Sequence, residues 1–110
     1  PVPGINSADD EFDAAWLDNG KAIVYAHSKD ADNTPIRLMV SRCDGSRYVD
    51  PQPLALSFNT ESNYTLGPVA DLSRPGELLI SGIAPSPKAG KLDIYRMRAP
   101  QLHGLSGCVR

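Results

Sequence analysis

Four acidic side chains gather near the start of the chain, where they could hold a cation or transfer protons. Asp9, Asp10, Glu11 and Asp13 lie close together, and paired carboxylates are common groups in acid–base catalysis. We interpret this stretch instead as a solvated loop between structural units, in which Glu11 hydrogen-bonds a turn. The sequence therefore predicts no catalytic residue here.

A second polar stretch, KDADNT, alternates Asp30, Asp32 and Asn33 as part of a calcium-binding loop would. An EF-hand loop needs Gly at its sixth position and Glu at its twelfth. Counted from Asp30, those positions hold Pro35 and Ser41, so the motif is incomplete. A weak surface calcium site is the alternative to a plain polar loop. We expect no metal and no cofactor.

Nucleophilic catalysis would require a nucleophile, a base and an acid in one place. The chain has only two histidines, His27 and His103, and no G-x-S-x-G motif. His27 and Ser28 are neighbours in a predicted strand, so their side chains point to opposite faces. The sequence predicts that the chain is not an enzyme and has no catalytic residues.

The bulk composition excludes several classes of partner. The 110 residues are 41% hydrophobic and 22% charged, with a net charge of −2, which is ordinary for a soluble globular chain. No apolar run approaches the roughly 20 residues of a membrane span. The arginines are scattered rather than clustered (Arg37, Arg42, Arg47, Arg96 and Arg98). We expect neither nucleic-acid binding nor membrane insertion.

Cys43 and Cys108 are the only cysteines. Two cysteines permit one disulfide, which would suit a secreted or periplasmic protein, and two unpaired thiols are the alternative. Neither cysteine has a second Cys or a His at zinc-site spacing. A possible Cys43–Cys108 disulfide is therefore the prediction for this pair.

The elements that must position these residues are predicted to be strands joined by tight turns. KAIVYAHS is apolar on both alternating sides, as in a strand covered on both faces. Asn19-Gly20 joins it to AAWL, because both residues tolerate the positive φ of a type I′ turn. IRLMVSR follows after a polar loop, and Asp44-Gly45 turns the chain into SRYV. The best helical candidate, DDEFDAAWL, is cut short by Asn19-Gly20.

The same order of elements then recurs. GPVADLSRPGELLISGI gives a strand, a turn and a buried strand, and KLDIYRMRA takes the place of IRLMVSRCD. Gly20 and Gly76 are 56 residues apart, as are Leu38 and Ile94. A period near 50 residues is typical of propeller blades. We expect a first blade with a preceding strand segment over residues 1–57, and a second blade with a C-terminal tail over residues 58–110.

These motifs resemble the WD40-like repeats of the TolB-type β-propeller family. The residues that carry the resemblance are Asn6, Glu11, Phe12, Trp16, Asn19, Gly20, Lys21, Ile23, Val24 and Tyr25, and then Asn59, Tyr64, Pro68, Pro75, Gly76, Leu79, Asp93, Ile94, Tyr95 and Arg96. The resemblance covers roughly residues 5–98. It implies four-stranded antiparallel blades, usually in rings of about six or seven, and a periplasmic or secreted protein. PIRLMV lacks the acidic residue of LDIY, so the first blade is the looser match.

The predicted fold class is therefore all-β: two four-stranded propeller blades that form an incomplete ring or a fragment. Trp16 and Tyr95 are expected to pack between blades. The expected function is a non-catalytic module for protein–protein interaction or ligand binding, part of a larger or oligomeric propeller. Open blade edges carry unpaired N–H and C=O groups, so a protein partner or self-association is expected there. The predicted interaction loops contain Lys29, Asp30, Asp32 and Asn33 in the first blade, and Pro85, Pro87 and Lys88 in the second.

Two alternatives follow from the same sequence. The chain could be the propeller portion of a larger hydrolase of the prolyl-oligopeptidase type, gating an active site carried by another domain. It could also be a small β-sandwich in which the repeat is a coincidence. Strand order separates the sandwich from the blades, because a propeller pairs consecutive strands within each blade.

Overall fold

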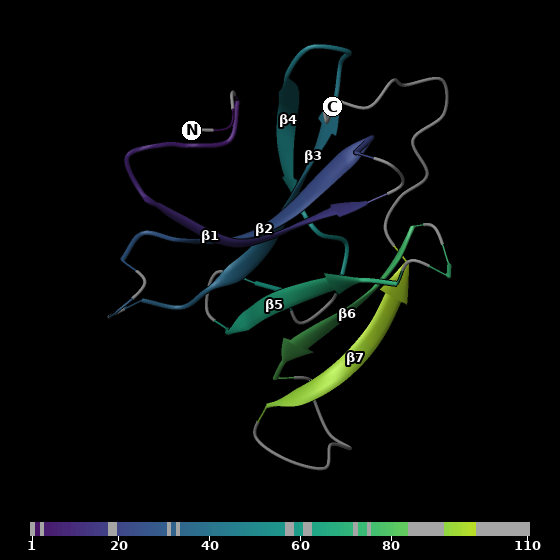
Figure 1. Ribbon diagram of the computed structural model, residues 1–110. Helices are drawn as coiled ribbons and strands as arrows, with labels where there is room; N and C mark the ends of the chain where they lie inside the picture. Colours follow the sequence, from purple (N-terminus) through teal and green to yellow (C-terminus); the bar gives the residue numbers. More distant parts are fainter. Residues whose placement is uncertain are drawn as a thin grey trace.

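The chain is all-β in the computed structural model, which describes residues 2, 4–17, 20–30, 32, 34–56, 59–60, 63–71, 73–74, 76–83 and 92–98. Figure 1 shows two antiparallel sheets, and the described ranges contain no helix. It follows that this part of the chain also has no helix that could cross a membrane. The all-β prediction is confirmed.

The first sheet has the order β1-β2-β3-β4. Its strands are β1 (Asp10–Leu17), β2 (Ala22–Ser28), β3 (Arg37–Cys43) and β4 (Tyr48–Pro53). All but one of the β2 residues are buried, as its two apolar sides predict. The acidic stretch was wrongly predicted to be a loop, because Asp10, Glu11 and Asp13 extend β1 beside β2. For the same reason DDEFDAAWL is not a helix.

The second sheet has the order β5-β6-β7. Its strands are β5 (Thr65–Ala70), β6 (Glu77–Gly82) and β7 (Asp93–Arg98). In both sheets every strand pairs with its neighbour in sequence. The first sheet has the predicted four strands, and the second has three within the described residues. The predicted boundary at 57–58 lies outside those residues.

Each sheet has a β-bulge in its first strand. Between Phe12 and Ala15 of β1, two residues oppose Tyr25 of β2, and Asp13 has a φ of 50°. In β5 the corresponding bulge opposes Ile80, and Gly67 has a φ of 64°. A bulge with a left-handed residue bends the strand and increases its twist.

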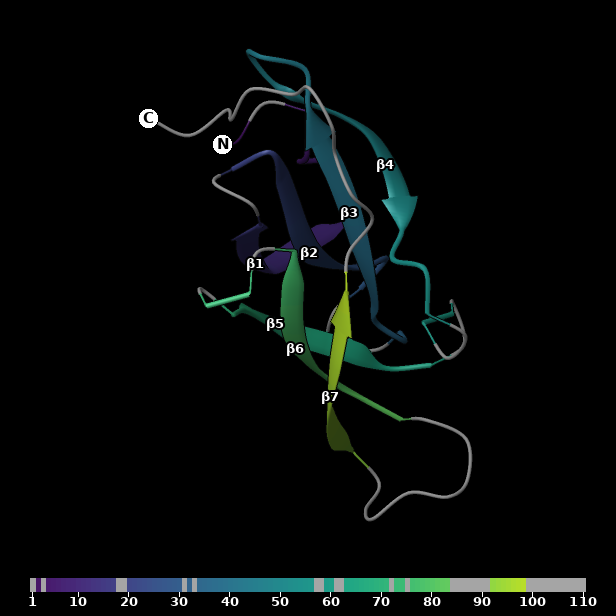
Figure 2. The same ribbon diagram turned by 90° about the vertical axis from the view of Figure 1, so that its right-hand side faces the viewer.

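The main core lies between the two sheets, where β5 contacts β1, β2 and β3. Figures 1 and 2 show β5 on the side of the second sheet next to the first. Its fully buried members include Val24 and Leu38 from the first sheet and Leu78 and Ile80 from the second. Tyr95 packs against this cluster, as predicted. Burial of such side chains contributes about 1.5–3 kcal/mol each.

A second, smaller cluster lies on the other face of the first sheet. Ile23, Tyr25, Cys43 and Tyr48 pack there with Ile5 from the N-terminal segment. The Tyr48 hydroxyl donates a hydrogen bond to the Gly20 carbonyl, 3.0 Å away.

Trp16 does not pack between the two sheets described, contrary to the prediction for these two units. Trp16 pairs with Ile23, yet its side chain is 55% exposed. It lies one residue from the end of β1, beyond the reach of the N-terminal segment that packs on Ile23. Trp16 therefore lies outside the part of this face that the N-terminal segment covers.

Hydrogen bonds fasten the connection between the sheets to the first sheet, and a backbone bond reaches the second. Asn59 is 6% exposed, and its amide oxygen accepts a bond from Leu38 N at 2.7 Å. Its amide nitrogen donates to the carbonyls of Leu38 and Leu54, at 2.8 and 2.9 Å. Ile36 and Thr65 add a backbone bond of 2.8 Å between the loop before β3 and the start of β5.

The bulges show which residues correspond between the sheets. Tyr25 and Ile80 each oppose a bulge, so they occupy the same structural position. Their β-partners, Met39 and Tyr95, therefore correspond as well. The pair Leu38 and Ile94 follows one residue earlier and keeps the predicted spacing of 56 residues. Tyr25 and Ile80 are 55 residues apart, so the predicted equivalence of Gly20 and Gly76 is off by one residue.

Corresponding residues nevertheless face opposite ways. We call the face of the first sheet with Val24, Ala26 and Leu38 its leading face, and the face with Tyr25 and Met39 its trailing face. The leading face contributes to the core between the sheets, and the trailing face carries the smaller cluster. In the second sheet, Ile80 and Tyr95 contact that same core. The leading face of the first sheet therefore packs against the trailing face of the second.

Candidate functional site

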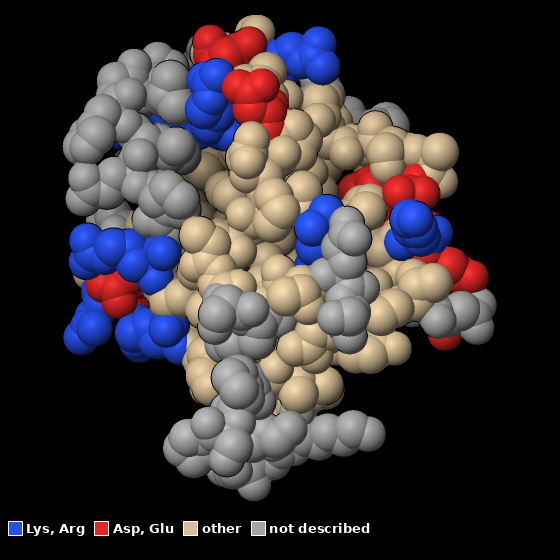
Figure 3. All heavy atoms as spheres, turned by 180° about the vertical axis from the view of Figure 1, so that it is seen from behind, with Lys and Arg blue, Asp and Glu red and all other residues tan. Residues whose placement is uncertain are grey.

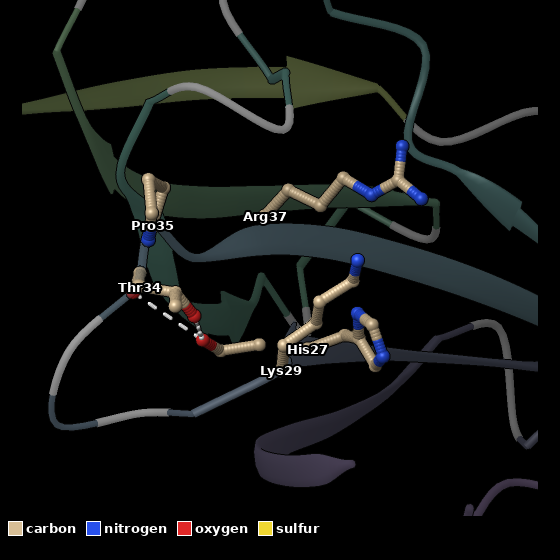
Figure 4. Close-up of a pocket in the computed structure, with 6 residues that line it drawn as sticks. His27, Lys29, Thr34, Pro35 and Arg37 are labelled. Atoms are coloured by element: carbon tan, nitrogen blue, oxygen red, sulfur yellow. Dashed lines mark hydrogen bonds between the residues drawn. The ribbon is translucent and has the colours of Figure 1, made fainter.

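A pocket of about 170 Å³ opens where β2 ends and β3 begins. Its lining is shown in Figure 4 and consists of His27, Ser28, Lys29, Thr34, Pro35 and Arg37. The sheet fixes His27 and Arg37, because the two residues are directly paired across β2 and β3. The remaining lining comes from the loop between the strands.

Hydrogen bonds centred on Thr34 hold this loop. Its hydroxyl lies 2.6 Å from that of buried Ser28, and its N–H donates to the Asp30 carbonyl at 2.8 Å. The Thr34 hydroxyl also accepts from Asp30 N at 3.1 Å. Asp32 N donates to the Asp30 carboxylate at 3.1 Å, which makes an Asx turn. The loop is therefore built around its own polar groups.

Carboxylates of β1 and the segment before it hold the His27 ring. Its Nε2 lies 3.1 Å from Asp9 Oδ2 and 3.7 Å from Glu11 Oε2. Glu11 also accepts hydrogen bonds from the Ser7 N–H and hydroxyl, at 2.8 and 2.7 Å. The predicted role of Glu11 in hydrogen-bonding a turn is confirmed by these bonds.

Lys29 and Arg37 are the cationic side chains of the pocket lining. His27 also lines the pocket, and its ring contacts Asp9. In Figure 4 the side chains of Lys29 and His27 extend side by side, and Arg37 extends from the neighbouring strand. The lining itself carries no carboxylate in the described structure. This arrangement suits recognition of an anionic group.

The predicted interaction residues are only partly brought together. Lys29 lines the pocket, whereas Asp30 organises the loop and Asp32 is exposed beside it. Asn33, and the whole predicted contact set of the second loop, Pro85, Pro87 and Lys88, lie outside the described residues.

Sequence reasoning did not single out Thr34 or assign Arg37 to a site. The spacing of Ser28 and Thr34 around an Asp in SKDADNTP is a signal for a hydrogen-bonded loop. The pairing of His27 with Arg37 required the strand register.

The described residues contain no group of three or more His, Cys, Asp or Glu placed to hold a metal ion. Ser28 is buried against Thr34, and His27 points to the other face. These two side chains do not form a nucleophile–base pair. Burial raises the pKa of the Tyr25 phenol, so this tyrosine of the trailing face is neutral at physiological pH.

Cys43 is fully buried in the smaller cluster, and its Sγ accepts a hydrogen bond from Gly45 N at 3.2 Å. Cys108 lies outside the described residues, so the disulfide between them stays a prediction.

Charged groups elsewhere are mostly paired. On the face shown in Figure 3, Lys and Arg lie beside Asp and Glu in small separate groups, with uncharged surface between them. Arg42 lies 2.6 Å from Asp50, and Arg96 lies 2.7 Å from Asp71. This face offers no continuous basic surface.

Comparison of the chain with protein-family models, with curated proteins and with solved structures finds no match in any of the three.

Proposed function

We propose that this chain is a non-catalytic β-propeller module for protein–protein interaction, in which the two sheets are consecutive blades. A further sheet of the same kind docks on the second one, supplied by a longer chain or by another copy. The resemblance to TolB-type repeats supports this proposal, as does the pairing of consecutive strands in both sheets. A periplasmic or secreted location belongs to the same proposal, because it suits a Cys43–Cys108 disulfide.

The observation that carries the proposal is the way in which the two sheets pack. Equivalent residues face opposite ways, so the contact joins two different surfaces. A contact of this heterologous kind leaves one unmatched surface at each end and repeats until a ring closes. The leading face of the second sheet is one of these unmatched surfaces, and the trailing face of the first sheet is the other.

That leading face carries apolar side chains where the first sheet carries core residues. Ile94 corresponds to Leu38, which is fully buried, yet Ile94 is 73% exposed. Val69 follows the β5 bulge as Ala15 follows the β1 bulge, and it is 60% exposed. Leu79 pairs with Val69 on one side and with Arg96 on the other. Ile94 lies diagonally across from Leu79, opposite Ser81. Together they form an apolar surface.

Charged side chains adjoin these apolar residues on the same face, beginning with Arg96 opposite Leu79, and they are paired with one another. Arg96 contacts Asp71 at 2.7 Å and Glu77 at 3.6 Å, and Arg98 contacts Glu77 at 3.4 Å. Exposed pairs of this kind contribute little to stability. Because their charges are already matched, they border the apolar surface without opposing a docked sheet.

Sedimentation equilibrium of the full chain over a range of concentrations tests the proposal. We expect the average mass to rise with concentration, and Ile94→Lys to remove that rise because a buried lysine charge is costly. Ser46→Lys is the control, since it adds the same charge at an exposed residue of the turn between β3 and β4, outside the strands of either sheet. A chain that stays monomeric at every concentration, with full β circular dichroism, would contradict the proposal.

A further inference from the structure

We propose that residues 4–6, which we call the strap, compete with a second copy of this chain for the trailing face of the first sheet. The inference rests on the proposed function, because the second copy would dock there through the leading face of its own second sheet. It adds a regulatory element to that docking, since the strap must open before the second copy can bind.

Equivalent positions on the two trailing faces have different neighbours. Ile23 and Tyr25 of β2 correspond to Leu78 and Ile80 of β6. The β6 pair is buried in the core between the sheets, whereas the β2 pair is buried in the smaller cluster with Ile5. Ile5 of the strap therefore packs on the surface that, in the second sheet, receives a neighbouring sheet.

The strap covers only part of this face. Trp16 pairs with Ile23, and its side chain is 55% exposed. The corresponding residue of the second sheet is Ala70, which pairs with Leu78 and packs against the main core. A second copy docked on the trailing face would cover Trp16 in the same way. An exposed tryptophan beside a covered apolar cluster is the kind of side chain that anchors a protein interface.

The strap can open without breaking a strand pair. The Ile5 N–H and the Asn6 side-chain amide both donate to the Val2 carbonyl, at 3.4 and 3.3 Å, so these bonds stay within the N-terminal segment. The Ser7 N–H and hydroxyl donate to Glu11 of β1 at 2.8 and 2.7 Å, which fixes the base of the strap. Opening therefore releases the packing of Ile5, and segments with few apolar contacts open at low cost.

Two substitutions should open the strap. Gly4 has a φ of +88°, and a Cβ there would overlap the Tyr48 carbonyl oxygen, so Gly4→Ala prevents the closed position. Ile5→Ala removes most of the buried side chain and remains informative if Gly4→Ala does not fold. The affinity for a partner is reduced by the fraction of molecules in which the binding surface is open. Burial of one isoleucine favours the closed strap by about tenfold or more, and both variants should therefore associate more strongly by about that factor.

The test is sedimentation equilibrium of the full chain, combined with the fluorescence of Trp16, the only tryptophan. We expect the mass of both strap variants to rise at about tenfold lower concentration than that of the wild type. Trp16 emission should move to shorter wavelength over the same range, because docking covers its ring. Gly45→Ala is the control, since Gly45 also has a positive φ but a Cβ there would meet nothing within 4 Å. It should associate as the wild type does.

Ile94→Lys placed in the Gly4→Ala background identifies the docking surface of the second copy. It should abolish the rise in mass, and a double variant that still associates would overturn the inference. A rise in mass without any change in Trp16 emission would also overturn it, because the second copy would then dock elsewhere.

The remaining outcomes separate this inference from the proposed function. If the wild type associates and the strap variants associate at the same concentration, the strap does not compete and the proposed function stands. If wild type and strap variants alike keep a constant monomer mass, the inference and the docking on which it rests are both wrong.

Discussion

Gly4 is a residue whose small size the structure requires. Its φ is +88°, and a Cβ there would overlap the Tyr48 carbonyl oxygen. This close approach lets Ile5 pack on Tyr25 and Tyr48 in the smaller cluster. Gly4→Ala should therefore lower the free energy of unfolding by about 3 kcal/mol, measured by urea denaturation.

Gly76 provides the control for backbone strain. Its φ of +85° is nearly the same, and a Cβ there would meet nothing within 4 Å. Gly76→Ala should cost only about 1 kcal/mol, the strain of a left-handed residue. Equal losses for the two variants would mean that the contact with Tyr48 is unimportant.

Asp71 gives a pH-dependent contribution at the residue scale. The Ser73 hydroxyl and the Arg96 guanidinium donate to its carboxylate at 2.6 and 2.7 Å. These bonds lower the pKa of Asp71 from 3.8 to about 2. A lowered pKa stabilises the folded state above the unfolded pKa, and that stabilisation is lost as pH falls through the folded pKa.

Urea unfolding of the wild type and Asp71→Asn measures this contribution. The wild type should be the more stable at pH 6, and the difference should shrink between pH 3.8 and about 2. A difference that is unchanged at pH 2 would refute the ionic role of Asp71.

At the scale of elements, Asn59 fastens the entry of the second sheet to β3. It is buried and makes three hydrogen bonds, two to Leu38 and one to Leu54. Asn59→Ala should lower the free energy of unfolding by about 3 kcal/mol, because backbone groups of Leu38 and Leu54 lose a buried partner.

Asn6 is the control, since it is an asparagine in the segment before the first sheet. It is exposed and makes a single bond of 3.3 Å to the Val2 carbonyl. Asn6→Ala should change stability by less than about 0.5 kcal/mol. An equally small loss of unfolding free energy for Asn59→Ala would mean that its amide does not fasten the segment before β5 to β3.

The strands of the described sheets were predictable because their signals are local. Alternating apolar residues and turn pairs such as Asp44-Gly45 mark β2, β3 and β4 directly. The β1 bulge was not predictable, since Asp13 has a φ of 50° without a glycine to signal it, and Asp50 in β4 has the same φ. The turn at Asn19 lies outside the described residues, although Gly20 has the expected positive φ of 81°.

The candidate site was predicted in part, for a related reason. Polar composition marked the loop with Lys29, Asp30 and Asp32. Strand register then brought His27 opposite Arg37, which no sequence neighbour could indicate. Trp16 was misplaced because an aromatic at an alternating strand position is usually covered, and its cover depends on how far the N-terminal segment reaches.

At the scale of the whole molecule, the repeat identifies equivalent residues that face opposite ways in the two sheets. Leu38 and Ile94 occupy equivalent positions, yet one is buried between sheets and the other is exposed. The exposed leading face of β5–β7 is therefore the surface on which a third sheet would continue the arrangement.

Hydrogen exchange of β7 measured at low and high protein concentration tests this account most directly. A sheet docked on Ile94 and Leu79 would restrict opening of β7, so amides of Asp93–Arg98 should exchange more slowly as concentration rises. Amides of β3 should change less, because β3 is an inner strand of the first sheet, between β2 and β4. Exchange in β7 that does not depend on concentration, together with a constant monomer mass, would contradict the central claim.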